Sequence, residues 1–178
     1  MNLKDLQFTR LSQRNETKDF DCGDDDLNDF IRNDAWNYQN ELLSVTYLFE
    51  NKQSEVVAFF SVSNDSLKDA DYEKWNNLSR KVSNRKRRKD YPAVMIGRIG
   101  VSSKFKGNNL GSDILFFIKN WFTSENKTGC RFVLVDAYNN PQVINFYQKN
   151  EFTLLTEKDA EKKTRSMYFD LVRMIPKS

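Results

Sequence analysis

The chain has 178 residues, of which 39% are hydrophobic and 30% charged, with a net charge of +3. These values suit one packed domain, 1–178, and exclude both a disordered chain and a chain that is strongly basic as a whole. The absence of histidine excludes Ser-His-Asp, Cys-His and HExxH chemistry, and two cysteines cannot supply a four-ligand zinc site. The start of the chain has no apolar signal segment and no apolar run reaches the roughly 18 residues of a membrane span, so the sequence predicts a cytoplasmic protein.

The first half of the chain predicts a strand, a helix, a hairpin and a second helix. Leu27, Phe30 and Ile31 follow helical spacing, and three aspartates beginning at Asp24 suit the positive end of a helix. The predicted ranges are 5–11 for the strand, 24–40 for the helix, 41–50 and 55–63 for the hairpin, and 67–80 for the second helix.

The second half alternates strands and helices before two closing strands. The predicted ranges are strand 93–102, helix 110–123, strand 131–137, a helix from Asn140 as N-cap with Pro141 in its first turn, and strands 152–155 and 165–172. A strand–helix–strand unit implies a parallel, centrally splayed pair. The sequence therefore predicts an α/β (α+β) domain with a mixed, mostly antiparallel sheet of roughly six or seven strands and about four helices.

The segment 104–113 carries two glycines, Gly107 and Gly111, between a predicted strand and a predicted helix. Glycine permits backbone conformations that a Cβ forbids, and the first N–H groups of a helix attract anions. Lys106 adds a positive charge and Ser112 a hydroxyl donor. The segment is either a phosphate cradle or a plain strand-to-helix turn.

Two further glycines, Gly97 and Gly100, interrupt the preceding strand. Glycine inside a strand often marks a bulge or the close approach of a ligand, and an amide-bearing ligand can pair with a free strand edge. A diphosphate at the loop with an amide-bearing arm along the strand describes coenzyme A.

Tyr147 follows the Asn140 cap by seven positions, beside Phe146. An aromatic pair in a helix usually packs in the core. A tyrosine with a pKa near 10 can also keep a proton at neutral pH and give it to a departing thiolate.

The combination of IGVSSKFKGNNLGSDIL with NNPQVINFYQKNEF resembles the GNAT superfamily of acetyl-CoA-dependent N-acetyltransferases. That family's phosphate loop reads Gln/Arg-x-x-Gly-x-Gly/Ala, so that Lys106 stands for Gln/Arg and Asn109 for a glycine. Its helix signature Phe-Tyr-x-x-x-Gly-Phe also lacks the glycine here, because Glu151 precedes Phe152. The segment FDCGDDDLNDFIRNDA is similar to the Phe-x-Cys-Gly segment of GNAT toxins from toxin–antitoxin pairs and of their non-toxin relatives.

The resemblance implies a binding site for acetyl-CoA along much of the chain. The pantetheine arm would pair with the backbone of Ile99, Gly100 and Val101. The pyrophosphate would lie on the amides of Lys106, Gly107, Asn108, Asn109, Leu110, Gly111 and Ser112. Asn140 would lie near the cofactor and Tyr147 near its sulfur. Because amides bind phosphate whatever the side chain, and asparagine tolerates positive φ, Asn109 would weaken this site without abolishing it.

Direct acyl transfer is the simplest chemistry for such a site: an amine attacks the thioester, a backbone N–H stabilises the oxyanion, and Tyr147 protonates the thiolate. Asp136 is a candidate base, although a structural role is as well supported. At pH 7 about one tenth of an α-amine is neutral, against about one in 2,500 of a lysine amine. The missing histidine therefore favours an α-amine acceptor.

A basic run contains seven cations within residues 80–89, which are Arg80, Lys81, Arg85, Lys86, Arg87, Arg88 and Lys89. It is either a solvated loop or a contact for an RNA backbone. The favoured hypothesis is an acetyltransferase acting on a small amine, a protein N-terminus or, as GNAT toxins do, a charged tRNA. An antitoxin and a second copy of the chain are candidate partners. The alternatives are a non-catalytic coenzyme A-binding module and a basic RNA-binding protein with a decayed acetyltransferase fold.

Overall fold

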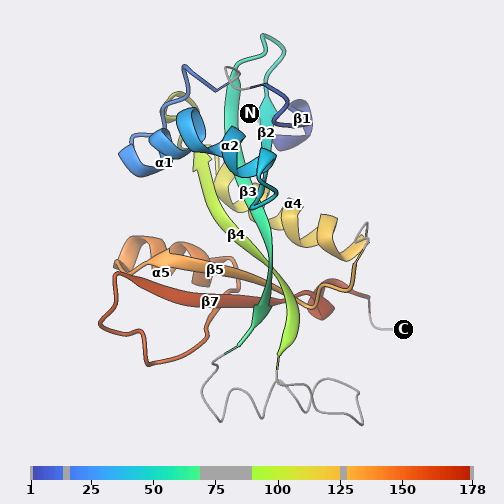
Figure 1. Ribbon diagram of the computed structural model, residues 1–178, viewed down its shortest axis with the longest axis vertical. Coiled ribbons are helices and arrows are strands. Elements are labelled where there is room, and N and C mark those ends of the chain that lie inside the picture. Colours follow the sequence, from blue (N-terminus) through green and yellow to red (C-terminus); the bar gives the residue numbers. More distant parts are fainter. Residues whose placement is uncertain (1, 14–16, 69–89, 125–127, 177–178) are drawn as a thin grey trace. The chain divides into compact units, whose positions relative to one another are not determined.

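A computed structural model describes residues 2–13, 17–68, 90–124 and 128–176 (Figure 1). Its strands are β1 (Gln7–Arg10), β2 (Val45–Glu50), β3 (Val56–Leu67), β4 (Tyr91–Val101), β5 (Phe132–Tyr138), β6 (Thr153–Leu154) and β7 (Thr164–Asp170). They form one sheet in the order β1-β2-β3-β4-β5-β7-β6, in which β4 and β5 run parallel. The pairs β1–β2, β2–β3, β5–β7 and β6–β7 are antiparallel. The predicted mixed sheet and its parallel pair are confirmed.

Three helical segments lie in the described residues. The first combines α1 (Asp25–Asp29), a π-helical stretch (Phe30–Asp34) and α2 (Ala35–Asn40), and the others are α4 (Leu110–Ser124) and α5 (Pro141–Lys149). The N-cap predicted at Asn140 is present, because Asn140 Oδ1 accepts from Val143 N at 2.9 Å, and Asp24, the first of the three aspartates, also caps its helix by accepting from Leu27 N at 3.0 Å. None of the helices in the described part of the chain is long and apolar enough to span a bilayer.

Some predicted boundaries are wrong. The predicted helix 67–80 begins inside a strand, because Leu67 ends β3, and its remaining residues from 69 onward lie outside the described residues. The strand predicted for 41–50 begins only at Val45. Leu42 takes a φ of +60°, and Leu43 N bonds back to Tyr38 O at 2.8 Å, so this segment turns instead of extending. The strand predicted for 165–172 stops at Asp170, where a 3-10 turn (Leu171–Met174) begins.

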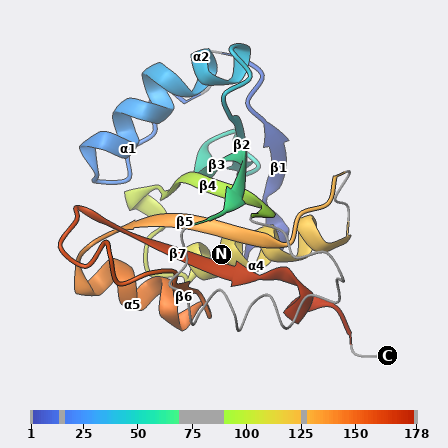
Figure 2. The ribbon, with the colours of Figure 1, turned by 60° about the horizontal axis from the view of Figure 1, so that its bottom comes forward.

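The chain divides into two compact units, Met1–Ser63 with Ile96–Ile118, and Asn64–Met95 with Lys119–Ser178. In the first unit, the apolar stripe of the first helix packs on β2 and β3. Phe30, Ile31 and Ala35 are buried together with Leu48 and Phe59. Figure 2 shows this helix in blue beside β2.

In the second unit the two faces of β5 and β7 carry different clusters. Phe132 and Leu134 point to one face and pack with Leu67, Tyr91, Ala93 and Leu155. Val133 and Val135 alternate to the other face, where α5 lies along β5 and β7 (Figures 1 and 2). The register pairs Asp136 with Ser166 and Val133 with Phe169, so that each pair shares a face.

Candidate functional site

The loop before α4 adopts the backbone conformation of an anion-binding turn. Gly107 has a φ of +87° and Asn109 a φ of +58°. Asn109 therefore occupies the left-handed region, which asparagine enters at lower cost than most residues. Its carbonyl accepts from Ser112 N at 3.0 Å and from Asp113 N at 3.2 Å, and these bonds start the helix. The asparagine thus keeps the turn that a glycine would make.

A row of backbone donors runs along this loop. Within the described residues, the backbone N–H groups of 107–111 have no hydrogen-bond acceptor, whereas those of Ser112 and Asp113 do. Residues 107–109 are also exposed. Unpaired N–H groups at the start of a 15-residue helix present partial positive charge to solvent. This arrangement suits a phosphate group.

The side chain of Lys106 links this loop to a distant segment of the first unit. Lys106 Nζ donates to the carbonyl oxygen of Cys22 at 2.6 Å. Gly23 takes a φ of +74°, and a Cβ there would lie 3.5 Å from Lys106 Nζ. The sequence showed both segments, but nothing in their spacing indicated that they touch.

The carboxylate of Asp21 adds negative charge beside this lysine. A hydrogen bond from Gly23 N, followed by one from the Asn28 amide, holds the pKa of Asp21 below its usual value, and the cations of Arg32 and Lys106 contribute less. The thiol of Cys22 is buried and donates to Asn28 Oδ1 at 3.3 Å, and burial raises its pKa. Cys22 is therefore a packing residue.

The glycines of β4 accommodate side chains of the neighbouring strand. A Cβ on Gly100 would lie 2.6 Å from Cε1 of Phe59, and one on Gly97 would lie 3.3 Å from Ser61 Oγ. The close approach inferred from these glycines therefore comes from the protein's own side chains. The pairing of a pantetheine arm with the backbone of 99–101 does not depend on this explanation and stays a prediction.

Tyr147 lies on α5 in the second unit, and its side chain is 7% exposed. Its ring meets those of Phe146 and Phe152 at centroid distances of 5.1 and 5.5 Å. Burial raises the pKa of Tyr147 to about 12. The hydroxyl therefore keeps its proton over the whole physiological range, and the ring also serves as a core residue.

The end of α5 is held by an unusual pair of contacts. Glu151 takes a φ of +65°, and the bonds Phe152 N to Tyr147 O (3.0 Å) and Glu151 N to Gln148 O (2.8 Å) form a Schellman motif. This position normally carries glycine.

Lys119 Nζ donates to the carbonyl of Asn150 at 2.6 Å and lies 4.0 Å from the ring centroid of Phe169. Burial lowers the pKa of Lys119 to about 8.

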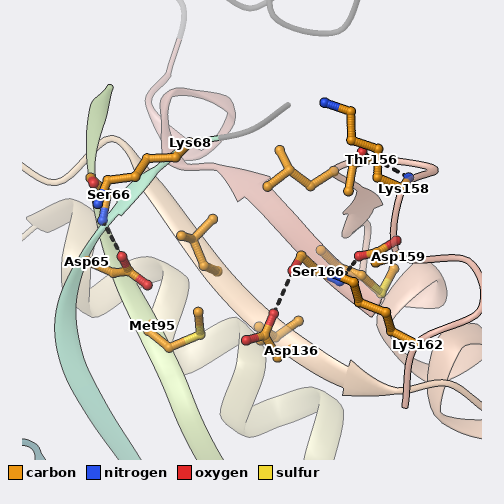
Figure 3. Close-up of a pocket in the computed structure, with 14 residues that line it drawn as sticks. Asp65, Ser66, Lys68, Met95, Asp136, Thr156, Lys158, Asp159, Lys162 and Ser166 are labelled. Carbon is orange, nitrogen blue, oxygen red and sulfur yellow. Dashed lines mark hydrogen bonds between the residues drawn. The ribbon is translucent and has the colours of Figure 1, made fainter. Parts of the chain in front are cut away.

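A cavity of about 460 Å³ opens in the second unit, on the face of β5 and β7 that carries Leu134 and lies opposite α5 (Figure 3). Leu134, Leu155 and Met95 provide apolar lining. Charged groups complete it, namely Asp65, Asp136, Asp159, Lys68, Lys158 and Lys162. Sequence reasoning missed this cavity because its walls come from four separated segments.

The carboxylates of this cavity differ in their surroundings. Asp159 is buried, and its two oxygens accept from Arg165 Nε and Ser166 N, both at 2.7 Å. Asp136 is exposed and accepts one bond, from Ser166 Oγ at 2.7 Å. Asp159 thus fixes the loop between β6 and β7, whereas Asp136 presents a carboxylate to the cavity. The basic run 80–89 lies outside the described residues.

The mixed sheet and its helices define an α/β protein with a row of backbone donors before α4, and comparison with known proteins specifies its family. The model of the family described as Acetyltransferase (GNAT) family matches residues 7–152. The chain belongs to the GNAT family, whose members are acetyl-CoA-dependent N-acetyltransferases.

Several solved structures share this fold. AtaTR bound with acetyl-CoA matches with a TM-score of 0.76 at 19% identity, and the match covers 96% of each chain. A tyrosine-to-phenylalanine mutant of KacT gives a TM-score of 0.76 at 15% identity, covering 96% of this chain and 99% of that one. AtaT complexed with an acetyl-methionyl-tRNA gives 0.75 at 17% identity, covering 96% and 97%.

Proposed function

We propose that this acetyltransferase moves the acetyl group of acetyl-CoA directly to an α-amine, and that the amine belongs to an aminoacyl-tRNA. The observation that carries the cofactor part is the row of unpaired N–H groups at 107–111, held open by positive φ at Gly107 and Asn109. A row of amides at a helix start binds phosphate oxygens without needing any particular side chain.

The residues of the chain take distinct roles in this proposal. The amides of 107–111 bind the pyrophosphate, and the backbone of 99–101 pairs with the pantetheine arm. The amide of Ser112, which the sequence assigned to the same row, donates instead to the carbonyl of Asn109 at 3.0 Å. Lys106 adds a cation, whose position the carbonyl of Cys22 fixes at 2.6 Å. Asn140, which caps α5, lies near the cofactor, and Tyr147 near its sulfur. Bound acetyl-CoA supplies the activated acetyl group.

The raised pKa of Tyr147 decides how this hydroxyl acts. With a pKa of about 12, it is a weaker acid than an alkyl thiol, whose pKa is about 8.5. Complete proton transfer to the thiolate would therefore be uphill by about 5 kcal/mol while the hydroxyl stays in this environment. Tyr147 is better suited to hydrogen-bond the sulfur as its charge develops and to release the proton late.

The choice of an α-amine rests on the lack of a strong base. The chain has no histidine, so an amine that is partly neutral at pH 7 is the easier acceptor. The fold is shared with AtaT, which was solved with an acetyl-methionyl-tRNA. The basic run 80–89 would supply contacts to the tRNA backbone. A cytoplasmic enzyme would meet this substrate.

The test measures thiol release from acetyl-CoA with aminoacyl-tRNA, uncharged tRNA and free lysine as acceptors. Wild-type protein should release thiol with the first alone, and Tyr147→Phe should slow this release at least 100-fold. Tyr38→Phe, the same chemical change at a 43% exposed position, should retain the wild-type rate. An unchanged rate in Tyr147→Phe would remove this residue from the mechanism.

The structure bears on the alternative of a decayed, non-catalytic module. Both positions that lack the family glycine, Asn109 and Glu151, still take a positive φ, of +58° and +65°. The backbone that glycine would permit is therefore retained. Calorimetry measures coenzyme A binding, and thiol release from acetyl-CoA measures turnover. Binding together with turnover would favour the enzyme. Binding with no acceptor acetylated would favour the non-catalytic module.

The fold shared with AtaT also supports a proposal about the protein partners of this chain. AtaT has been solved bound to the C-terminus of the antitoxin AtaR, at 17% identity to this chain over 96% of each. We propose an antitoxin and a second copy of this chain as partners. Co-purification with the product of an adjacent gene, and light scattering of the isolated protein, test the two.

A further inference from the structure

Segment 17–23, which contains the residues Phe-x-Cys-Gly, forms no helix or strand but is fixed to the first helical segment by hydrogen bonds. Thr17 Oγ1 donates to the carbonyl of Ile31 at 2.7 Å, inside the π-helical stretch, and Arg32 Nε donates to the carbonyl of Phe20 at 2.9 Å. Thr17 and Phe20 are buried. The backbone of this segment therefore has a defined place on the helix.

The side chain of Asn28 in α1 holds the end of this segment with both ends of its amide. Its Oδ1 accepts from Cys22 N at 2.9 Å, and its Nδ2 donates to Asp21 Oδ1 at 2.8 Å. The same Asp21 oxygen accepts from Gly23 N at 2.8 Å. A backbone N–H only donates and a carboxylate only accepts, so one orientation of the amide satisfies both partners. Asn28 is buried, and its removal would leave these groups unpaired.

The carbonyl groups of two adjacent residues in this segment bond to the loop before α4. Ser103 N donates to the carbonyl of Asp21 at 2.8 Å, and Lys106 Nζ donates to the carbonyl of Cys22 at 2.6 Å. Lys106 directly precedes the row of unpaired amides at 107–111. A chain of hydrogen bonds therefore runs from the first helix, through two backbone carbonyls, to the start of this row.

The ring of Phe20 links the same segment to the strand before the loop. It meets the ring of Phe59 edge to face, at a centroid distance of 5.2 Å. Phe59 is fully buried and fills the space in which a side chain at Gly100 would lie. Segment 17–23 is therefore linked to both stretches that the proposed function assigns to the cofactor, the backbone of 99–101 and the amides of 107–111.

These links affect affinity because a loop must be ordered before several of its amides can bind one anion. Ordering a backbone costs conformational entropy, and a loop that is ordered on folding does not incur this cost on binding. Residues 106–109 are exposed, so side-chain packing does little to order them. The carbonyls of Asp21 and Cys22 are therefore the contacts that order this loop on its N-terminal side.

We propose that segment 17–23 is a positioning element for the cofactor: Asn28 fixes two carbonyls, and these hold the start of the loop so that the amides of 107–111 are arranged for a pyrophosphate before it binds. The proposal rests on the proposed binding of acetyl-CoA. It assigns part of the cofactor affinity to Asn28, which is buried and has no contact with the cofactor in the proposed function. Lys106 acts through its bond to the carbonyl of Cys22, and the thiol of Cys22 takes no part.

Calorimetry with coenzyme A tests the proposal in two variants and their combination. Asn28→Ala and Lys106→Met should each weaken binding about tenfold, which is the range for the net loss of a hydrogen bond. The double variant should also bind about tenfold more weakly than wild-type protein, because both changes break the same chain of contacts. Losses that multiply to about a hundredfold would overturn the proposal, since Lys106 would then act independently of Asn28.

Two exposed positions provide matched controls. Lys104→Met removes the same charge from the same loop, where Nζ bonds to the Glu55 carboxylate instead of to the segment, and should bind coenzyme A within about twofold of wild type. Asn37→Ala, at an exposed position of α2, should bind like wild type. Lys106→Arg keeps a donor for the Cys22 carbonyl and should bind within about threefold of wild type. An equal loss in Lys104→Met and Lys106→Met would assign the effect to charge and overturn the proposal.

Amide exchange in the ligand-free protein, followed by NMR, tests the positioning of the loop without any cofactor. The amides of Ser103 and Phe105 should exchange about tenfold faster in Asn28→Ala and in Lys106→Met than in wild-type protein, while the amides of β5 keep their rates. Unchanged exchange at both loop amides would overturn the proposal. If Asn28→Ala unfolds, the amides of β5 also exchange fast, and Lys106→Met, a change at an exposed position, then decides the outcome.

The wild-type protein separates this proposal from the function on which it rests. Wild-type protein that binds no coenzyme A would refute the proposed cofactor and, with it, this role of the segment. Wild-type binding together with unchanged affinity in Asn28→Ala and Lys106→Met would refute the role of the segment and leave the proposed acetyltransferase function standing.

Discussion

The buried cation of Lys119 should make the stability of the protein rise with pH in a range where most proteins lose stability. Its side chain is 4% exposed, between the carbonyl of Asn150 and the rings of Phe152 and Phe169. Burial lowers its pKa to about 8, while Glu151 opposes this shift and Arg173 adds to it. Lys119→Met removes the charge and keeps a flexible apolar chain of similar length.

The sign and size follow from proton linkage. A lysine of the unfolded chain has a pKa of about 10.4, so between pH 8 and 10 the unfolded state holds more protons than the folded state. Stability therefore increases as pH rises through this range. With a folded pKa of about 8, the gain between pH 7 and pH 9.5 amounts to about 2 kcal/mol, and the full gain above pH 10.4 to about 3 kcal/mol.

Urea denaturation followed by tryptophan fluorescence at pH 7, 8, 9 and 9.5 measures this gain. The free energy of unfolding of wild-type protein minus that of Lys119→Met should grow by about 2 kcal/mol over the series. Lys149→Met, an exposed lysine of α5, should show no such change. Subtracting the two free energies of unfolding removes the pH dependence of every group that titrates alike in both proteins.

A constant difference across the series would refute this reasoning. It would mean that the Asn150 carbonyl and the two aromatic rings fully replace the water that the ammonium group loses, so that the pKa stays at its ordinary value. A decrease with rising pH would show that the charged lysine stabilises the fold.

Four further predictions concern single positions. Glu151→Gly should be more stable than Glu151→Ala by about 1 kcal/mol, or about 2–4 °C in thermal melting, because both lose the contact with Arg173 but only glycine relieves the φ of +65°; equal melting temperatures would contradict this strain. Asn109→Gly should keep or tighten coenzyme A binding in calorimetry, whereas Asn109→Val should weaken it about tenfold or more, since a β-branched residue resists a φ of +58°. Gly100→Ala should lower the free energy of unfolding by about 1–3 kcal/mol through its contact with Phe59, and adding Phe59→Leu should recover part of the loss. Because the pKa of Tyr147 is about 12, the rate of acetyl transfer should show no alkaline fall from this hydroxyl below pH 10; a fall near pH 9 that Tyr147→Phe abolishes would count against that pKa.

Local signals in the sequence determined much of the fold and one half of the candidate site. Periodicity and caps located the helices that begin at Asp25, Leu110 and Pro141, because capping and amphipathic spacing are properties of neighbouring residues. The two glycines, Gly107 and Gly111, before a predicted helix indicated either a phosphate cradle or a plain turn, and a turn is present, with positive φ at Gly107 and Asn109. The strand–helix–strand order also predicted the parallel pair of β4 and β5, because such a crossover has few alternatives.

Only the tertiary structure decided which distant residues meet. Lys106 contacts Cys22, the glycine at 100 accommodates Phe59, and Asp136 shares a cavity with residues from three other segments. The burial of Tyr147 and Lys119, and hence their displaced pKa values, likewise depends on packing between elements. Periodicity reports how a residue relates to its neighbours in the chain, whereas contacts, cavities and desolvation arise from the pairing of strands and helices far apart in sequence. For that reason the turn before α4 was visible in the sequence and the cavity was not.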